Sequence, residues 1–384
     1  MPGLGALRRS LRLLLLRALG ALTRRLVAAQ TREVRRVLVI KPDHLGDVLL
    51  LTPALRLLRQ QRPELEISLL IGPWSKVAVA HNSDIDALLL CEFPGFTRAA
   101  KPGLFQPYAL LLKTALLLRA GRYDTALIAR DDHWWGALLA ALAGIPQRIG
   151  FAVAETAPFL TTTLPHTFDE HVAAQNLQLV TALTGQSTTT QPLMVAPIGT
   201  QDRAWAEQWL ARHEITEQTT LVAIHPGSGG EAKLWLASRW TEIANALHDQ
   251  WVTVVLTGGP DEHELVTSIA EAMRSQPLTM VGEATLGQLA ALYARCALVL
   301  GVDSGPLHLA VSTGVPTLAL FGPGDDRRFG PWGDPRRHVV VRSGLWCSPC
   351  GVLHACPRGT APSECMAQIS AAQLLPTIDS LLDR

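Results

Sequence analysis

The chain has 384 residues, of which 48% are apolar and 17% are charged, and its net charge is +1. This length is typical of two domains, each with its own hydrophobic core. Residues 1–36 hold nine Arg and one Glu, a net charge of about +8, so the rest of the chain carries about −7. An acidic main body argues against nucleic acid as a partner.

Residues 4–30 predict a basic amphipathic helix within an N-terminal extension, residues 1–35. At the helical repeat one face carries Leu7, Leu11, Leu14, Ala18 and Leu22. The other face carries Arg9, Arg12, Arg17 and Arg24, although Leu13 and Leu16 fall among them. Such a helix could lie on an anionic membrane surface. Its uncharged runs are too short to span a bilayer, which needs about 20 residues. The alternative is a helix packed on its own domain.

From residue 36 onward, short aliphatic runs alternate with helical patterns. The predicted strands are 37–41, 67–71, 87–90, 125–128, 221–225, 252–257, 298–302, 317–321 and 338–341. The predicted helices are 48–60, 104–120, 133–144, 169–184, 237–249, 261–273, 286–295, 305–313 and 367–382. Strands that are apolar throughout suit parallel sheets buried on both faces. The succession predicts an α/β protein with two doubly wound, Rossmann-like domains, 36–190 and 200–384.

Polar residues gather where predicted strands end, and ligands of open α/β sheets bind at the carboxyl ends of the strands. The segments that follow five of the strands are PDHLGD, PGSGGEAKLW, GGPDEHE, DSGPLH and GPGDDRR. Any one of them could be an ordinary turn. Together they favour a binding site.

Residues 303–310, DSGPLHLA, predict a strand end that runs into a helix. Ser304 is placed to cap the helix and Pro306 to lie in its first turn. The exposed N–H groups there would suit a phosphate, and Gly305 would permit a close approach. Lys233 follows a second Gly-rich loop and could neutralise a phosphate. Glu262 could hold ribose hydroxyls or simply complement a helix N-terminus.

No GxxxxGK[ST] loop is present, and no GxGxxG follows the first strand. These absences argue against a P-loop nucleotidase and a dinucleotide-dependent dehydrogenase.

With these residues placed, the chain resembles glycosyltransferase family 9, the heptosyltransferases of lipopolysaccharide core assembly. The resemblance covers residues 36–384 and rests on LGDVLLLTPAL, HPGSGGEAKLW, VLTGGPDE, LGQLAALYARCALVLGVDSGPLHLA and ALFGP, in this order. It implies the GT-B arrangement, in which two Rossmann-like domains face a cleft. It also implies inverting transfer of a sugar, with ADP-heptose as the typical donor, and no metal required for catalysis.

Several residues gain roles from this resemblance. Asp47 would be the general base and Lys233 would balance the charge of the departing diphosphate. The implied donor-binding residues are His225, Gly227, Ser228, Lys233, Glu262, Asp303, Ser304, Gly305, Pro306, Leu307 and His308. Residues His44 and Gly46 would lie on the acceptor side. Base and phosphate site are expected on different domains, which would close around both substrates.

The expected acceptor is the lipopolysaccharide core or another lipid-linked or cell-envelope glycan. The enzyme would then be cytoplasmic and peripheral at the inner face of the plasma membrane. A nucleotide-sugar epimerase on the same fold is one alternative, and a non-catalytic nucleotide-sugar-binding module is another. The joint presence of Asp47, Lys233 and residues 303–308 argues against the second.

Four of the six cysteines crowd into residues 347–365, namely Cys347, Cys350, Cys356 and Cys365. A CxxC followed by two more thiols is compatible with a structural zinc site, although the second pair lacks that spacing. The alternatives are a reduced thiol-rich loop and a disulfide between Cys347 and Cys350.

Overall fold

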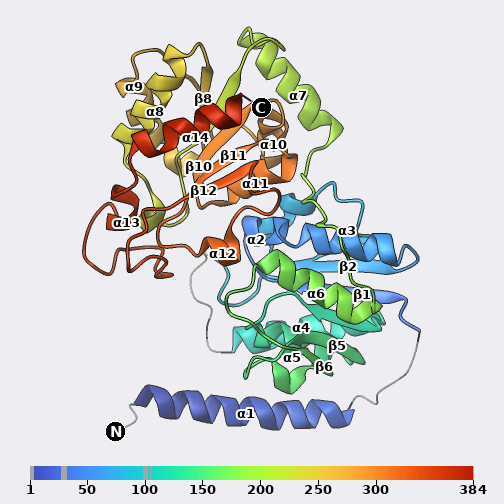
Figure 1. Cartoon of the computed structure of the whole chain (residues 1–384). Coiled ribbons are helices and arrows are strands. Elements are labelled where there is room, and N and C mark those ends of the chain that lie inside the picture. The colour runs from blue at the N-terminus through green and yellow to red at the C-terminus, as the bar shows by residue number, and fades with distance from the viewer. Residues whose placement is uncertain (1–3, 27–32, 98–102, 104, 384) are drawn as a thin grey trace. The chain divides into compact units, whose positions relative to one another are not determined.

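The computed structural model describes residues 4–26, 33–97, 103 and 105–383, and of residues 4–9 and 24–26 only the backbone. It forms two compact units (Figure 1). Unit 1 comprises Met1–His44, Pro53–Lys76 and Ser83–Pro192. Unit 2 comprises Leu45–Thr52, Val77–Asn82 and Leu193–Arg384.

Unit 1 is built on a sheet of six parallel strands in the order β3-β2-β1-β4-β5-β6. The strands are β1 (Arg36–Lys41), β2 (Glu66–Ile71), β3 (Ala87–Leu90), β4 (Thr125–Ile128), β5 (Gln147–Phe151) and β6 (Thr162–Leu164). Its other elements are α1 (Leu4–Leu26), most of α3 (Thr52–Gln61), the first part of η1 (Pro73–Val79), α4 (Gln106–Ala120), α5 (Trp134–Leu142), η2 (Ala157–Phe159) and α6 (Val172–Thr184). Leu38 and Ile40 of β1 share one hydrophobic cluster with residues of α4 and α5, so these helices cover one face of the sheet.

Unit 2 is built on a second parallel sheet, in the order β12-β11-β10-β7-β8-β9. The strands are β7 (Leu221–His225), β8 (Thr253–Gly258), β9 (Leu278–Val281), β10 (Leu298–Val302), β11 (Thr317–Leu320) and β12 (His338–Val341). The longer helices are α7 (Thr200–Arg212), α8 (Ala237–Asp249), α9 (His263–Ala272), α10 (Leu286–Tyr293), α11 (Gly305–Thr313) and α14 (Ala371–Leu382). Shorter elements are α2 (Leu45–Leu49), η3 (Glu231–Lys233), η4 (Pro260–Glu262), α12 (Asp326–Phe329) and α13 (Glu364–Ala367).

Alternate residues of β7 point to opposite faces of this second sheet. Val222 and Ile224 join a cluster with α8, α9 and α14, whereas Leu221 and Ala223 join one with α7 and α10. Because both faces are covered, the strand is apolar throughout. The predicted fold class, two doubly wound Rossmann-like domains, is therefore confirmed.

Among the elements described, three strands were not predicted, and neither were helix α7 and the short helices α12 and α13. The strands β5, β6 and β9 are short, and the first two contain Arg, Gln or Thr in place of an aliphatic run. Helix α7 (Thr200–Arg212) begins at the first residue of the predicted domain 200–384.

The predicted domain range 36–190 needs one correction. Leu45–Thr52 and Val77–Asn82 group with unit 2, although they lie within that range. The reason is local packing, because α2 lies against α11. Helix α1, which lies within the predicted extension 1–35, packs on α5 and η2 of unit 1. Among the helices described, none is both long and apolar enough to cross a membrane.

Candidate functional site

The Gly-rich loop after β7 is tied to the carboxyl end of β10 through Asp303. The Nζ of Lys233 lies 2.9 Å from Oδ2 of Asp303 and donates to the Asp303 carbonyl oxygen at 3.2 Å. The hydroxyl of Ser228 donates to the same carbonyl oxygen, also at 3.2 Å. Three of the predicted donor-binding residues therefore meet at one point, and Lys233 is a partly buried member of a network.

Residues 304–308 begin helix α11 as predicted. Ser304 is the N-cap, and its hydroxyl accepts a hydrogen bond from the Leu307 N–H at 3.4 Å. Pro306 lies in the first turn. A helix of nine residues has the positive end of its dipole and its unsatisfied N–H groups here. This end of unit 2 could therefore bind an anionic group.

Gly324 is a site residue that was not predicted. A Cβ atom at this position would lie 2.3 Å from Oδ2 of Asp303, so the chain after β11 passes close to that carboxylate. The strand-end segment GPGDDRR was noted, but the spacing alone does not show which glycine makes the close approach.

A second cluster joins the ends of β7 and β8. Oε2 of Glu262 accepts a hydrogen bond from the Gly259 N–H at 2.7 Å and lies 3.4 Å from Nε2 of His225. A Cβ atom at Gly227 would lie 1.9 Å from Oε1 of the same carboxylate. A side chain at 227 would therefore displace the Glu262 carboxylate from this position. Three residues predicted to bind the donor, His225, Gly227 and Glu262, thus lie together.

His225 is buried and its ring is held on both sides. Its Nδ1 lies 3.0 Å from the Thr257 hydroxyl and 3.4 Å from the Tyr293 hydroxyl. Burial lowers the pKa of His225, and the nearby Glu262 carboxylate only partly opposes this effect. The imidazole is thus neutral, and Nε2–H can donate to Glu262 while Nδ1 accepts. Thr257 and Tyr293 lie inside predicted elements, and no motif distinguished them from core residues.

The segment that carries Asp47 packs on α11. A Cβ atom at Gly46 would lie 2.8 Å from the His308 ring, and one at Gly305 would lie 3.1 Å from Leu45. Asp47 itself is half-buried in the first turn of α2. We expected Asp47 on a different domain from residues 303–308, but it belongs to the same compact unit.

His44 and Asp43 belong to unit 1 and differ in burial. His44 is exposed, with its ring centroid 5.7 Å from that of Trp74. Asp43 is buried, with Oδ2 lying 3.1 Å from Nζ of Lys41, and Oδ1 accepts a hydrogen bond from Arg130. This ion cluster at the ends of β1 and β4 was missed, because Asp43 reads as a turn residue in the sequence.

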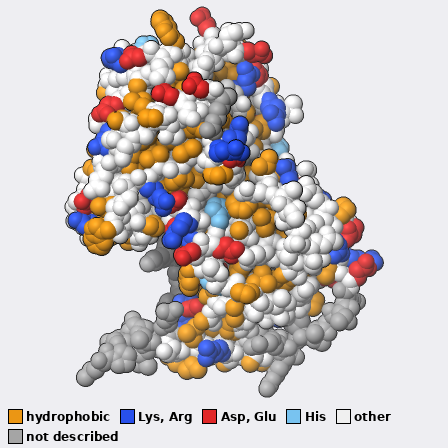
Figure 2. Space-filling model, in the orientation of Figure 1, with side chains coloured by type: hydrophobic (Ala, Val, Ile, Leu, Met, Phe, Trp, Pro, Cys, Tyr) orange, Lys and Arg blue, Asp and Glu red, His pale blue; other side chains and the backbone are white. Residues whose placement is uncertain are grey.

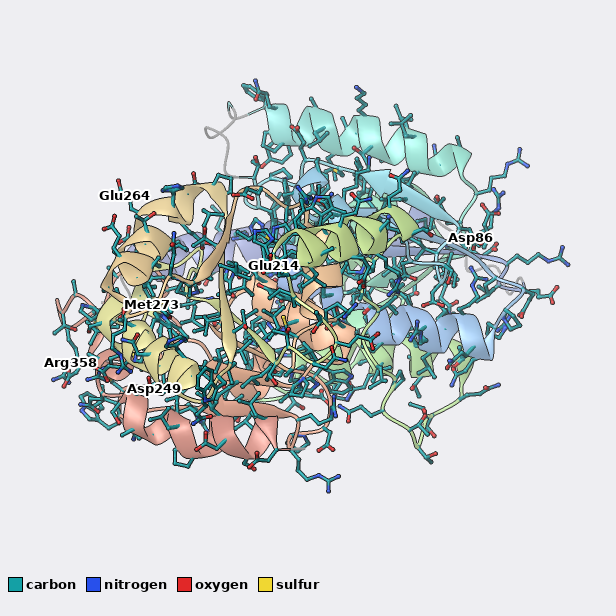
Figure 3. All side chains as sticks on the ribbon, turned by 90° about the horizontal axis from the view of Figure 1, so that it is seen from above. Asp86, Glu214, Asp249, Glu264, Met273 and Arg358 are labelled. Atoms are coloured by element: carbon teal, nitrogen blue, oxygen red, sulfur yellow. The ribbon has the colours of Figure 1, made fainter. Side chains whose placement is uncertain are left out.

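The Cys-rich segment contacts two loops of unit 2. The Ala232 N–H donates to the Leu353 carbonyl at 3.1 Å, and the Gly351 N–H donates to the Pro323 carbonyl at 2.9 Å. The segment therefore supports the loop that carries Lys233. Arg358, labelled in Figure 3, pairs with Glu364 at 2.7 Å.

The four cysteines of this segment are free thiols. Across the described parts of the chain, which include all of 347–365, no three His, Cys, Asp or Glu side chains converge as metal ligands. As placed, the thiols do not fit a closed tetrahedral zinc site. Zinc at Cys347, Cys350, Cys356 and Cys365 stays a prediction.

Cys356 is expected to be an unusually acidic thiol. A hydrogen bond from the Thr360 side chain, helped by the Arg358 backbone, lowers the pKa of Cys356 to about 7. Because the thiolate is the reactive form, iodoacetamide should alkylate Cys356 with a rate that rises with pH and is half-maximal near 7. Peptide mass spectrometry would follow this position. Thr360→Val should move the midpoint toward 9.0, the ordinary value, and equal midpoints in both proteins would contradict the assignment.

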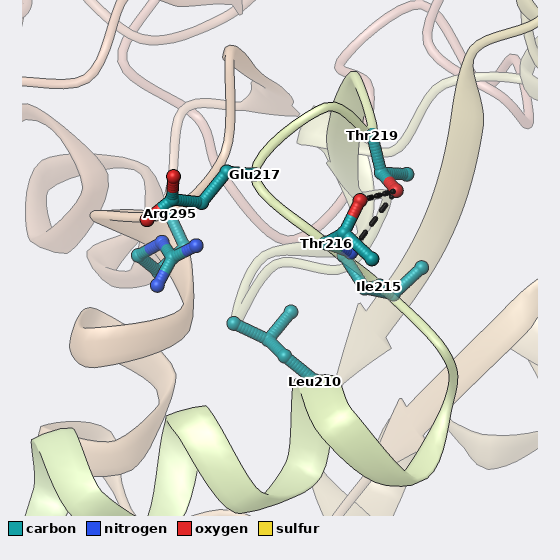
Figure 4. A pocket seen from close by; sticks show the side chains of 6 residues that line it. All are labelled: Leu210, Ile215, Thr216, Glu217, Thr219 and Arg295. Atoms are coloured by element: carbon teal, nitrogen blue, oxygen red, sulfur yellow. Dashed lines mark hydrogen bonds between the residues drawn. The ribbon is translucent and has the colours of Figure 1, made fainter.

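A pocket of about 280 Å³ lies elsewhere in unit 2 (Figure 4). Its lining residues are Leu210, Ile215, Thr216, Glu217, Thr219 and Arg295. Thr219 precedes β7, so the pocket lies near the amino end of that strand. None of the predicted site residues lines it, and ligands of such sheets bind at the opposite end.

Comparisons with known proteins identify the family of this chain. Residues 111–356 match the model of glycosyltransferase family 9 (heptosyltransferase). Lipopolysaccharide heptosyltransferase 3 from Escherichia coli is 29% identical over 345 residues, which cover 88% of this chain and 96% of that protein.

Two solved structures share the fold. A glycosyltransferase family 9 protein from Veillonella parvula DSM 2008 superposes with a TM-score of 0.76 at 26% identity, covering 92% of this chain and 99% of that one. The structure of the E. coli heptosyltransferase WaaC with ADP superposes with a TM-score of 0.66 at 18% identity. The match covers 90% of this chain and 99% of that one. The family match spans more than half of the sequence and confirms the resemblance seen in its motifs. The chain belongs to glycosyltransferase family 9 and is a glycosyltransferase.

Proposed function

We propose that this glycosyltransferase moves a heptose from ADP-heptose to the lipopolysaccharide core, with inversion at the anomeric carbon. An acceptor hydroxyl attacks that carbon, the bond from the carbon to the diphosphate oxygen breaks, and Asp47 takes the hydroxyl proton. Such a displacement passes through an oxocarbenium-like state while negative charge grows on the diphosphate. The site must therefore supply one base and several groups that stabilise the leaving charge.

One observation carries the proposal: α2 and α11 pack together in unit 2. Gly46 leaves room for the His308 ring, and Asp47 follows it directly. The predicted base is thus next in sequence to a residue that touches the predicted donor-binding helix. A carboxylate that only complemented the start of α2 would not require this contact.

We propose that the start of α11 and the Lys233 ammonium bind the leaving diphosphate. The N–H groups at the start of α11 form an anion site of a common kind. An ammonium group has three N–H donors, of which two are directed to Asp303. We propose that the third reaches the diphosphate, while Asp303 holds the ammonium in place.

Glu262 is proposed to contact the donor ribose. Its Oε2 accepts a hydrogen bond from the Gly259 N–H, so this oxygen stabilises the start of η4. Oε1, beside Gly227, is the oxygen we assign to the ribose hydroxyls. The other predicted donor-binding residues, Gly305, Pro306 and Leu307, would contribute backbone rather than side chains.

The donor and acceptor are proposed from the relatives. The similar E. coli protein is named a lipopolysaccharide heptosyltransferase, and the solved WaaC structure contains ADP. We propose that the transfer needs no metal ion, and that it takes place at the cytoplasmic face of the membrane that holds the acceptor.

The test is a transfer assay with purified protein, ADP-heptose and a heptose-free lipopolysaccharide core, in the presence of EDTA. We expect a core heavier by one heptose residue and release of ADP that depends on the acceptor. Thermal shifts with ADP, GDP, UDP and dTDP would identify the nucleotide, since ligand at about 100 times its Kd stabilises by about 2.7 kcal/mol. Donor consumed without acceptor to give an epimer would instead indicate an epimerase, and donor binding without turnover would indicate a binding module.

Lys233→Ala is expected to weaken donor handling. Loss of a hydrogen bond to a charged group costs about 1.5–3 kcal/mol, so kcat/KM for the donor should fall roughly 10- to 100-fold. Titration calorimetry with ADP would measure how much of this loss is a loss of nucleotide affinity. Arg358→Ala, which removes a cation elsewhere in unit 2, is the control. Unchanged ADP affinity and rate in Lys233→Ala would rule out the role.

A further inference from the structure

Helix α1 has two apolar sides, and only one of them packs on the protein. Leu16, Gly20 and Thr23 are buried. A Cβ atom at Gly20 would lie 2.4 Å from the Pro158 carbonyl oxygen, and Leu16 joins the cluster that contains α5. These residues hold the helix on unit 1.

The other side of α1 is an exposed row of leucines. Leu11, Leu14, Leu15 and Leu22 are 67%, 61%, 60% and 56% exposed, and Ala18 lies among them. At the helical repeat these residues share one stripe, opposite to Leu16 and Gly20. The amphipathic face predicted from the sequence is therefore the face that points away from unit 1. In Figure 2 hydrophobic side chains lie along the lower edge of unit 1, where α1 runs.

Helix α4 repeats this pattern on the same side of the sheet. Its inner residues Leu111, Ala115 and Leu118 belong to the same cluster as Leu16. Its exposed large apolar residues are Phe105 (84%, at the N-cap), Tyr108 (58%), Leu112 (57%), Leu116 (67%) and Leu117 (66%). Both α1 and α4 contact α5, which lies between them (Figure 1). Figure 3 shows α4 (cyan) as an outer helix of unit 1.

The charges of both helices are of one sign. Helix α1 has six Arg and α4 has one Lys and one Arg, and neither contains Asp or Glu. Arg12 and Arg17 are exposed beside the leucine row, and the Arg12 guanidinium lies 5.3 Å from the Trp134 ring centroid. Apolar side chains bordered by cations suit a surface with hydrocarbon beneath anionic headgroups.

We infer that the outer faces of α1 and α4 form a docking surface for a bilayer that contains anionic lipids. The surface is defined by Leu11, Leu14, Leu15, Ala18 and Leu22 of α1 and by Phe105, Tyr108, Leu112, Leu116 and Leu117 of α4. A soluble protein rarely leaves so many large apolar residues exposed on neighbouring elements without a partner. The absence of acidic residues selects a membrane over an ordinary protein partner. The inference does not depend on which sugar is transferred.

The test is flotation of the full chain with vesicles of phosphatidylcholine alone and of phosphatidylcholine mixed with phosphatidylglycerol. We expect binding to the mixed vesicles, weakened by salt, with little binding to phosphatidylcholine alone. The triple variant L11Q/L14Q/L22Q and the double variant L112Q/L116Q should each lower the partition coefficient at least tenfold. Arg17→Gln should lower it about fivefold, from the contribution of one basic residue near the surface.

Matched controls are Leu193→Gln and Trp251→Asn, since both residues are exposed in unit 2, by 65% and 94%. They should bind vesicles like the unchanged protein. All variants should keep transfer to a water-soluble core oligosaccharide, which separates docking from the proposed function.

Three outcomes would overturn the inference. The first is that the unchanged protein floats with neither kind of vesicle. The second is that the leucine variants bind vesicles as well as the unchanged protein does. The third is a dimer, seen by light scattering, that the leucine variants dissociate while no vesicle is bound. That result would make the surface an interface between two copies.

Discussion

Asp47→Asn is expected to reduce kcat for transfer by about 10²- to 10⁴-fold, the usual contribution of a general base. The amide keeps the size of the side chain and can still accept a hydrogen bond, but it cannot take the acceptor proton. Donor binding should change little, because α11 and Lys233 carry it. Steady-state kinetics with saturating donor and acceptor would measure kcat, and ADP titration would measure binding.

The control is Asp261→Asn. Asp261 is an exposed carboxylate in the first turn of η4, as Asp47 is a carboxylate in the first turn of α2. If Asp47 only complemented a helix start, both variants would lose about 0.3–1 kcal/mol of stability and keep their activity. A kcat for Asp47→Asn within a few-fold of the unchanged protein would therefore refute the base assignment.

The sheets were predictable because their strands are buried on both faces. Continuous aliphatic runs identified nine of the twelve strands in the described part of the chain, among them β1, β7 and β10. Strand β5 was not predicted, because Arg148 interrupts its apolar residues. Its side chain is almost fully buried and donates to the carbonyl oxygens of Ile145 and Phe159, the latter at 2.6 Å. Hydrogen bonds from a buried charge to backbone carbonyls leave no pattern in the sequence.

The candidate site was predictable where its chemistry lies at strand ends. His225, Lys233, Glu262 and Asp303 each follow or end a predicted strand, and parallel strands bring such ends together. Packing contacts between distant segments were not predictable. No spacing shows that Leu353 accepts a hydrogen bond from the Lys233 loop. The placement of α2 with unit 2 likewise depends on tertiary contacts.

Asp43→Ala is expected to lower the free energy of unfolding of unit 1 by about 3–5 kcal/mol, the cost of removing one partner from a buried ion pair. The Asp43 and Lys41 side chains are 3% and 2% exposed. The Asp43 carbonyl also accepts from the Trp74 indole at 3.0 Å and from the Ser75 hydroxyl at 2.8 Å, which fixes the loop. Without the carboxylate, Lys41 and Arg130 become neighbouring cations, one of them buried. Urea unfolding followed by hydrogen exchange of the β1 and β4 amides would report on unit 1 by itself.

The matched control is Asp132→Asn, because Asp132 pairs with the same Arg130 but its side chain is 59% exposed. An exposed pair of this kind contributes at most about 1 kcal/mol. Combining Asp43→Ala with Lys41→Met should restore part of the lost stability, since the buried charge is then gone as well. Equal losses in Asp43→Ala and Asp132→Asn would show that burial of the pair has no effect on its energy.

The same carboxylate should give unit 1 a characteristic acid sensitivity. Burial by itself would raise the pKa of Asp43, but the charges of Lys41 and Arg130 outweigh it and hold the pKa below 3.8. Between the lowered pKa and 3.8 the unfolded chain binds more protons than the folded one, so stability rises with pH there. The contribution of Asp43 is thus complete above that range and is lost as pH falls through the folded pKa. The stability curves of Asp43→Ala and the unchanged protein should therefore converge in strong acid, and a constant difference at all pH values would contradict the ion-pair account.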